Sequence, residues 1–207
     1  MSPFNAESTA AEVIQGISLG GRTALVTGAS SGLGIETSRA LASAGARVLM
    51  AARDPGKLQA AMDAVLTAQP NAQLEPLHLD LADLASVRSA AQSVLAAHPQ
   101  LHLLINNAGV MACPLLRTAQ GFEMQFGTNH LGHFLFTGLL VPALLAAAPA
   151  RVVNLSSAGH KMAASNLEDP NYEHREYDKW QAYGESKTAN VLFSVALEQR
   201  LGRRGVH

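Results

Sequence analysis

The stretch TGASSGLG, from Thr27 to Gly34, follows an apolar run at residues 23–27 (TALVT) and opens a helix-like stretch at residues 32–44. Glycines at such a junction permit a tight turn, a close approach of the backbone to a pyrophosphate and close packing of the helix on the sheet. The N-terminus of the helix adds free N–H groups and a partial positive charge. A purely structural turn is the alternative. We predict that these turn residues bind the phosphates of a dinucleotide: Gly28, Ser30, Ser31, Gly32, Leu33 and Gly34.

Further apolar runs continue the pattern along the chain. They lie at residues 47–51, 74–79, 101–105 and 151–155, and none shows the strict polar alternation of a half-exposed sheet. Such runs are typical of a parallel sheet that is buried on both faces. Crossovers of one hand then predict an α/β fold with a doubly wound, mostly parallel sheet (Rossmann), strand order 3-2-1-4-5 and ligands at the carboxyl ends of the strands.

Helices are expected between these strands. Thr9 and Glu12 also form a possible capping box for a short leading helix. The irregular stretch 158–179 is interpreted either as a substrate-side loop or as a solvated insertion. The expected helices cover residues 32–44, a stretch that opens near Asp54-Pro55, 83–97, 120–147 with a kink near Pro142, and 180–201.

The domain organisation is expected to be an N-terminal extension, residues 1–20, followed by one dinucleotide-binding domain, residues 21–207. The chain ends with Gly205, Val206 and His207, where a sixth strand of such a fold should start. We expect the usual sixth and seventh strands to be missing, with an exposed sheet edge and an open pocket. The chain is then either a fragment or a shortened protein.

Composition narrows the range of partners. The 207 residues carry a formal net charge of -1, which implies no broad attraction to nucleic acid. The N-terminus lacks the features of a signal peptide, and the single Cys113 suits a reducing compartment, so a cytoplasmic location is expected. Residues 128–150 contain no charged side chain, but Asn129 and Pro142 favour a buried or interfacial helix over a membrane span. His130 and His133 lack a third ligand, so no metal site is expected.

The ends of the second, third and fourth strands carry candidate cofactor contacts. Ala52 and Arg53 stand where a carboxylate would grip the ribose of NAD, which favours NADP(H) over NAD(H); an ordinary surface arginine is the alternative. Asp80, with Leu81 after it, lies beside the expected adenine position, although Asp80 could equally cap a helix. Asn107, Ala108 and Gly109 permit a close approach to the cofactor, although the asparagines could also brace the strands.

A possible proton-handling group lies near the end of the chain. Tyr183 and Lys187 are four residues apart on the last predicted helix, which puts a phenol and an ammonium on one face. A nearby cation favours the phenolate, so this tyrosine could donate and accept a proton. Ser157 follows the fifth strand, and Asn129 lies inside an apolar helix, where it either satisfies a kink or holds a bound water.

These motifs, in this order, resemble the short-chain dehydrogenase/reductase family. They are TGASSGLG, NNAG at residues 106–109, Asn129, Ser157 and the Tyr183/Lys187 pair, and the resemblance runs from about Gly20 to the C-terminus. The sequences NHLGHF at residues 129–134 and YGESKTANVLF at residues 183–193 are most similar to those of the retinol-dehydrogenase-like and WW-domain-oxidoreductase-like branch.

The resemblance implies a role for each catalytic candidate. Tyr183 would be the general acid/base in hydride transfer between NADP(H) and a carbonyl or alcohol substrate. Lys187 would favour the phenolate of Tyr183 and bind the nicotinamide ribose, Ser157 would hold the substrate oxygen, and Asn129 would keep a relay water in place. The two long helices would form a homodimer or homotetramer. The alternative is a nucleotide-binding or scaffold protein without catalysis that retains the fold; the glycine spacing disfavours a nucleotide-sugar epimerase.

Overall fold

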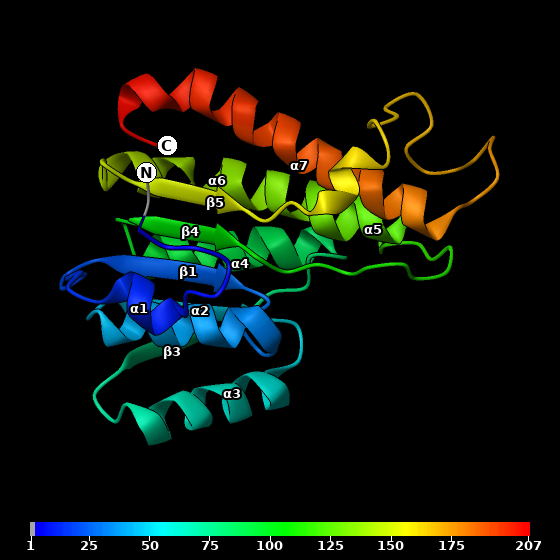
Figure 1. Cartoon of the computed structure of the whole chain (residues 1–207). Coiled ribbons are helices and arrows are strands. Elements are labelled where there is room, and N and C mark those ends of the chain that lie inside the picture. The colour runs from blue at the N-terminus through cyan, green and yellow to red at the C-terminus, as the bar shows by residue number, and fades with distance from the viewer. Residues whose placement is uncertain (1–2) are drawn as a thin grey trace.

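A computed structural model describes residues 3–207 and shows a twisted parallel sheet with helices on both faces (Figure 1). Every neighbouring pair of strands is parallel, and the order is β3-β2-β1-β4-β5. This confirms the predicted fold and strand order. The strands are β1 (Thr23–Thr27), β2 (Arg47–Ala52), β3 (Gln73–His78), β4 (Leu103–Asn106) and β5 (Arg151–Asn154).

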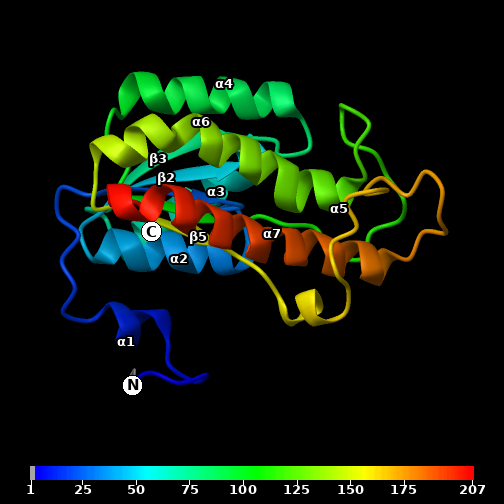
Figure 2. The same cartoon turned by 90° about the horizontal axis from the view of Figure 1, so that it is seen from above.

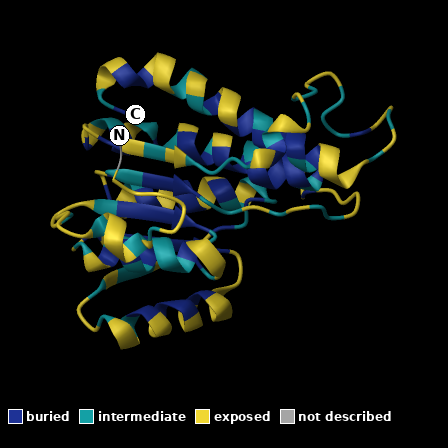
Figure 3. Cartoon of the chain, in the orientation of Figure 1, coloured by how far each residue is buried: buried dark blue, intermediate teal, exposed yellow. Residues whose placement is uncertain are grey.

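Two hydrophobic cores lie on the two faces of the sheet. On one face, Leu25 and Leu104 pack with residues of α4 (Leu84–Ala97), α6 (Gly132–Ala146) and α7 (Lys179–Leu201). On the other face, Val26 and Val48 pack with α2 (Gly32–Ser43) and α3 (Pro55–Ala68). Figure 2 shows α4 and α2 on opposite sides of the sheet, and Figure 3 shows the buried residues concentrated in the strands and on the helix faces that cover them. Because adjacent strand residues point to opposite cores, the strands read as continuous apolar runs.

Side-chain caps fix where several helices begin. Asp54 caps α3, which has Pro55 in its first turn, and Asp83 caps α4. Thr9 and Glu12 form the expected capping box of α1 (Ala10–Ile14), which contacts α2. The division of the chain at residues 20 and 21 stays a prediction.

The long helix predicted from residue 120 begins instead at Met124. Gly121 has φ +85° and Arg117 bridges to Glu123, so residues 117–123 form a turn. The Glu123 carboxylate then accepts hydrogen bonds from the N–H groups of Gln125 and Phe126, which caps the helix. The helix consists of α5 (Met124–Phe126), a π-helical turn (Gly127–Leu131) and α6, which contains Pro142.

The segment Met124–Ala146 is long and apolar enough to cross a membrane, judged by length and composition alone. A helix that covers a buried sheet passes the same test, and here Phe136, Leu140 and Leu144 are fully buried in the core. The segment is therefore weak evidence for a membrane span, and its packing agrees with the interpretation as a core helix.

The last described residues contact the outer side of β5. Val206 forms a parallel bridge to Ala150, and the N–H of Val152 donates to the carbonyl of His207 at 2.7 Å. Before this, the chain passes from α7 through a 3-10 turn (Gly202–Arg204). Among residues 3–207 the sheet has five strands, and the edge that was expected to be open is paired over this short part.

Candidate active site

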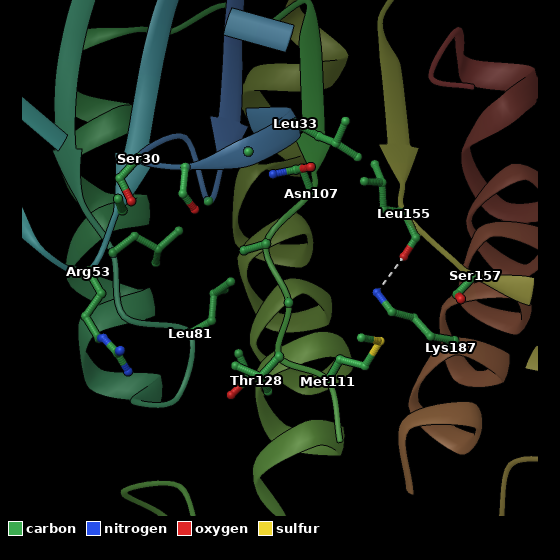
Figure 4. A pocket seen from close by; sticks show the side chains of 18 of the residues that line it. Ser30, Leu33, Arg53, Leu81, Asn107, Met111, Thr128, Leu155, Ser157 and Lys187 are labelled. Carbon is green, nitrogen blue, oxygen red and sulfur yellow. Dashed lines mark hydrogen bonds between the residues drawn. The ribbon is translucent and has the colours of Figure 1, made fainter. Parts of the chain in front are cut away.

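A cavity of about 570 Å³ lies at the carboxyl ends of the strands (Figure 4). It brings together both groups of residues that the sequence predicts. Ser30 and Arg53 lie at one end, and Ser157 and Lys187 at the other. The predicted residues that line it are Gly28, Ser30, Ser31, Gly32, Leu33, Arg53, Asp80, Leu81, Asn107, Ala108, Gly109, Ser157, Tyr183 and Lys187.

The glycine turn has the conformation that a phosphate cradle requires. Gly28 and Gly32 have φ values of +68° and +54°, which glycine adopts without strain. A Cβ on Gly34 would lie 2.2 Å from the carbonyl oxygen of Gly28, so Gly34 packs behind the turn and is not part of the cavity wall. Ser31 precedes α2 without a side-chain capping bond, and the helix N-terminus therefore meets the cavity open to an anion.

Two candidates lie at the nucleotide end of the cavity. Arg53 is exposed after β2, and among residues 3–207 no acidic side chain forms an ion pair with its guanidinium. Asp80 accepts a hydrogen bond from the N–H of Ala82 at 2.9 Å, and α4 is capped by Asp83. Asp80 therefore stabilises a turn next to the cavity and does not cap α4.

The asparagines after β4 brace the strands, and Asn107 also lines the cavity. Asn106 donates to Thr137 Oγ1 at 2.9 Å and to Asn154 Oδ1 at 2.7 Å. Asn107 donates through its side chain to the carbonyl of Thr27 at 2.8 Å. The hydroxyl oxygen of Thr27 accepts from the N–H groups of Asn107 and Ala108 at 3.0 Å each. The interpretation that the asparagines brace the strands is therefore confirmed, and the close approach of this segment to a cofactor stays a prediction.

Asn129 lies behind the cavity, fully buried in the π-helical turn. Its Oδ1 accepts from the N–H of Val110 at 2.8 Å, and its Nδ2 donates to Val110 O at 2.9 Å and to Ser186 Oγ at 3.0 Å. Asn129 thus ties the segment after β4 to α7. Its role in holding a water stays a prediction.

Tyr183 and Lys187 face the cavity from the first turns of α7. The Tyr183 ring packs on Gly159, where a Cβ would lie only 3.0 Å from Cε1. Lys187 Nζ lies 5.7 Å from the centroid of that ring and donates to Leu155 O at 3.1 Å. The ammonium group is mostly buried, and desolvation lowers the pKa of Lys187. Because burial removes most of the water around the ammonium group, its hydrogen bond to Leu155 O replaces part of the lost hydration.

The two serines after β5 have different contacts. Ser156 donates its hydroxyl to the main-chain carbonyl of Lys187 at 3.0 Å, which attaches the end of β5 to α7. Ser157 accepts from the N–H of Gly159 at 3.1 Å and caps the short 3-10 helix Ala158–Lys161. Within residues 3–207 the hydroxyl of Ser157 donates to no acceptor, so its proton is available to a ligand in the cavity, as the role predicted for Ser157 requires.

Several further wall residues were missed by the sequence reasoning. Most of them are direct neighbours of motif residues, so adjacency is the signal that could have found them. They are apolar except for one threonine. These residues are Leu79, Val110, Met111, Thr128 and Leu155.

The fold and the cavity define a Rossmann-type dinucleotide site with a tyrosine and a lysine at one end. The family model described as short chain dehydrogenase matches residues 22–207, and the chain belongs to this family. Within it, the chain belongs to the retinol-dehydrogenase-like branch, because it is 48% identical over 190 residues to "Retinol dehydrogenase 12" of Homo sapiens. That match covers 92% of this chain and 60% of the relative, so the chain spans about 60% of the relative's length.

Solved structures agree with this placement. A crystal structure of an uncharacterized protein from Mycobacterium paratuberculosis is 44% identical, with a TM-score of 0.84, and covers 97% of this chain and 69% of that one. A metagenomic short-chain oxidoreductase in complex with NADP is 29% identical, with a TM-score of 0.71, over 91% of this chain and 80% of that one.

Proposed function

We propose that the protein transfers a hydride between NADP(H) and a carbonyl or alcohol substrate, with Tyr183 as general acid/base. The observation that carries the proposal is that one cavity is lined by the glycine turn, Tyr183 and Lys187. The residues fit a dinucleotide, because Gly28 and Gly34 pack against neighbouring backbone too closely for a Cβ, which keeps the turn tight, and the helix N-terminus behind the turn favours phosphate. When bound, the nicotinamide supplies or takes the hydride.

The chain's own residues would manage the proton and the substrate oxygen. Tyr183 donates the proton of its hydroxyl to the substrate oxygen during reduction and takes one during oxidation. Lys187, held by Leu155 O at 3.1 Å, places its ammonium group 5.7 Å from the centroid of the Tyr183 ring, beside the proposed path of that proton. The free hydroxyl proton of Ser157 can hold the substrate oxygen.

Replacing Tyr183 with Phe tests this proposal, because it removes one hydroxyl and keeps the ring that packs on Gly159. We expect turnover of aldehydes and ketones to fall by at least about a thousandfold, with NADPH affinity unchanged. The serines offer a matched pair: Ser157→Ala should lower turnover strongly and Ser156→Ala only weakly. Turnover retained by Tyr183→Phe would refute the assignment.

NADP(H) is proposed over NAD(H) on the basis of charge. Arg53 is an exposed cation that forms no ion pair within the described chain, although its charge acts on the neighbouring Asp54, and the preceding Ala52 offers no carboxylate to a ribose. A 2′-phosphate could form a direct ion pair with its guanidinium. Arg53→Ala should raise the Michaelis constant for NADPH about tenfold or more and leave that for NADH nearly unchanged. Equal effects on both cofactors would overturn this preference.

A nucleotide-binding protein without catalysis is the second candidate, because the glycine turn and the helix N-terminus at the cavity would by themselves suffice to bind a nucleotide. Fluorescence titration with NADPH, combined with a turnover assay on assorted carbonyls, separates the two. Binding without turnover would support the second candidate. The presence of Ser157, Tyr183 and Lys187 in one cavity favours catalysis, because a pure binder has no need of all three.

We also propose self-association through the long helices. Phe134 on α6 and Leu192 and Val195 on α7 are each about half exposed, and the Phe134 and Phe193 rings are 5.1 Å apart. Apolar side chains gathered on neighbouring helices favour burial against a second copy. Sedimentation should show a dimer or tetramer that Leu192→Asp dissociates, while Leu33→Asp, an equally apolar exposed position on α2, should not. A wild-type monomer would contradict the proposal.

A further inference from the structure

The side chain of Gln125 makes a set of contacts that the catalytic motifs do not explain. It is fully buried in α5. Its Oε1 accepts from the N–H of Ala112 at 2.9 Å, and its Nε2 donates to Tyr177 Oη at 3.0 Å and to Lys179 O at 2.8 Å. Both hydrogens and the oxygen of the amide are therefore used, and each contact reaches a different segment.

Each of these segments leads to the cavity. Ala112 directly follows Met111, which lines the cavity wall. Lys179 is the first residue of α7, the helix that carries Tyr183 one turn later. Tyr177 belongs to the irregular stretch before α7. One buried amide thus connects a wall residue of the cavity to the start of the catalytic helix.

The backbone at Ala112 needs this support. Its φ of +52° lies in the left-handed region, which residues with a Cβ rarely adopt. The hydrogen bond from its N–H to Gln125 stabilises that conformation. On the other side, the carbonyl of Cys113 lies 3.0 Å from the Tyr177 hydroxyl, which also lies 3.2 Å from Glu123 Oε1. The turn after Met111 is therefore held on one side by the buried amide of Gln125 and on the other by the partly buried hydroxyl of Tyr177.

Met111 lies at the same end of the cavity as Lys187, away from Arg53 (Figure 4). Its side chain is 60% exposed and points into open space beside the candidate proton-handling residues. This is where the part of a substrate next to its carbonyl would lie. A shift of the turn would therefore change the fit of the substrate and leave the nucleotide end in place.

We infer that Gln125 is a positioning residue that sets the place of Met111 relative to Tyr183, and that Met111 contacts the substrate. The inference rests on the proposed function and assigns a determinant of substrate fit within it. Gln125 does not itself reach the cavity and acts through the backbone of Ala112.

Gln125→Met tests the inference, since it keeps a similar volume and removes all three hydrogen bonds. We expect the KM for a carbonyl substrate to rise about tenfold, with the KM for NADPH and kcat within about twofold of wild type. A merely structural role would instead lower the active fraction, and thus kcat, without moving KM. Met111→Ala should raise the carbonyl KM in the same way. Tyr177→Phe, which loses one hydroxyl, should raise it by about threefold and serves if Gln125→Met does not fold.

A rescue variant makes the test sharper. Glycine adopts a φ near +52° without strain. Adding Ala112→Gly to Gln125→Met should therefore reverse part of the rise in the carbonyl KM, and Ala112→Gly alone should change that KM little. If wild type turns over carbonyls but Gln125→Met and Tyr177→Phe leave KM unchanged, the positioning role is refuted and the proposed function survives. If Met111→Ala leaves KM unchanged, the substrate contact is refuted. If wild type binds NADPH without any turnover, the proposed function fails and this inference with it.

Discussion

His133 on α6 provides a quantitative test of the buried polar network. Its side chain is almost fully buried, with Nδ1 3.0 Å from Asn129 O and Nε2 2.9 Å from Thr27 Oγ1. A carbonyl only accepts, so Nδ1 carries the proton and Nε2 accepts from the Thr27 hydroxyl. A second proton would point at an oxygen that already accepts from Asn107 and Ala108. Burial first, and the nearby charge of Lys187, lower the pKa of His133 to about 4.

This shift makes stability depend on pH with a definite sign. The ordinary histidine value is 6.5, so the unfolded chain binds the proton first as the pH falls, and stability is lost between pH 6.5 and about 4. Linkage gives a loss of about 1 kcal/mol at pH 5.5 and about 2 to 3 kcal/mol at pH 4.5, with a limit of about 3 kcal/mol. Above pH 7 the contribution is constant.

Urea unfolding at several pH values between 4.5 and 7.5 measures this loss. Other titrating groups are shared by wild type and His133→Gln, so the difference between the two free energies of unfolding isolates His133. We expect the advantage of wild type to shrink by about 2 to 3 kcal/mol from pH 7.5 to 4.5. Parallel curves would refute the reasoning, as would an NMR titration of the wild-type ring that changes above pH 6.

Further predictions concern stability and nucleotide binding. Arg175 forms a bidentate pair with the buried Glu185, with both contacts at 2.6 Å, so Arg175→Leu should cost about 3 kcal/mol and lower the Tm by about 6–12 °C in calorimetry. An unchanged Tm would show that water replaces the cation. Gly34→Ala should weaken NADPH binding by at least about a hundredfold in fluorescence titration, because its Cβ would meet Gly28 O at 2.2 Å. Asp178→Ala removes the cap of α7 and should cost about 1 kcal/mol in urea unfolding; a neutral result would contradict the capping role.

The sheet could be predicted because its signal is local and strong. Strand residues such as Leu25, Val26 and Val48 are buried on one face or the other, so the central strands β1 and β2 are continuous apolar runs. The start of the long helix could not be placed in the same way. It depends on the bridge between Arg117 and Glu123 and on the capping carboxylate, and both require contacts that a helix-length pattern does not contain.

The residues of the site likewise fall into those that local spacing predicts and those that depend on distant contacts. Its motif residues were found because their spacing follows from the ends of strands and the turn of a helix. Gln125 was not found, because its importance comes from three partners that are between 13 and 54 residues away. The different contacts of Ser156 and Ser157 were likewise invisible, since both follow the same strand and only the fold decides which hydroxyl donates to α7.

The polar residues within the charge-free stretch 128–150 follow from the packing of α6 and α7. The Asn129 carbonyl, in the π-helical turn, accepts from His133 and from Asn190 Nδ2 at 3.1 Å, and Asn190 also donates to Leu155 O at 3.3 Å, the acceptor of Lys187. These donors are buried, so an apolar replacement at any one of them would leave a polar partner unsatisfied. The same stretch can therefore be long and apolar enough for a membrane by composition and still be specified as a core helix, because its polar groups find partners on β1, β4 and α7.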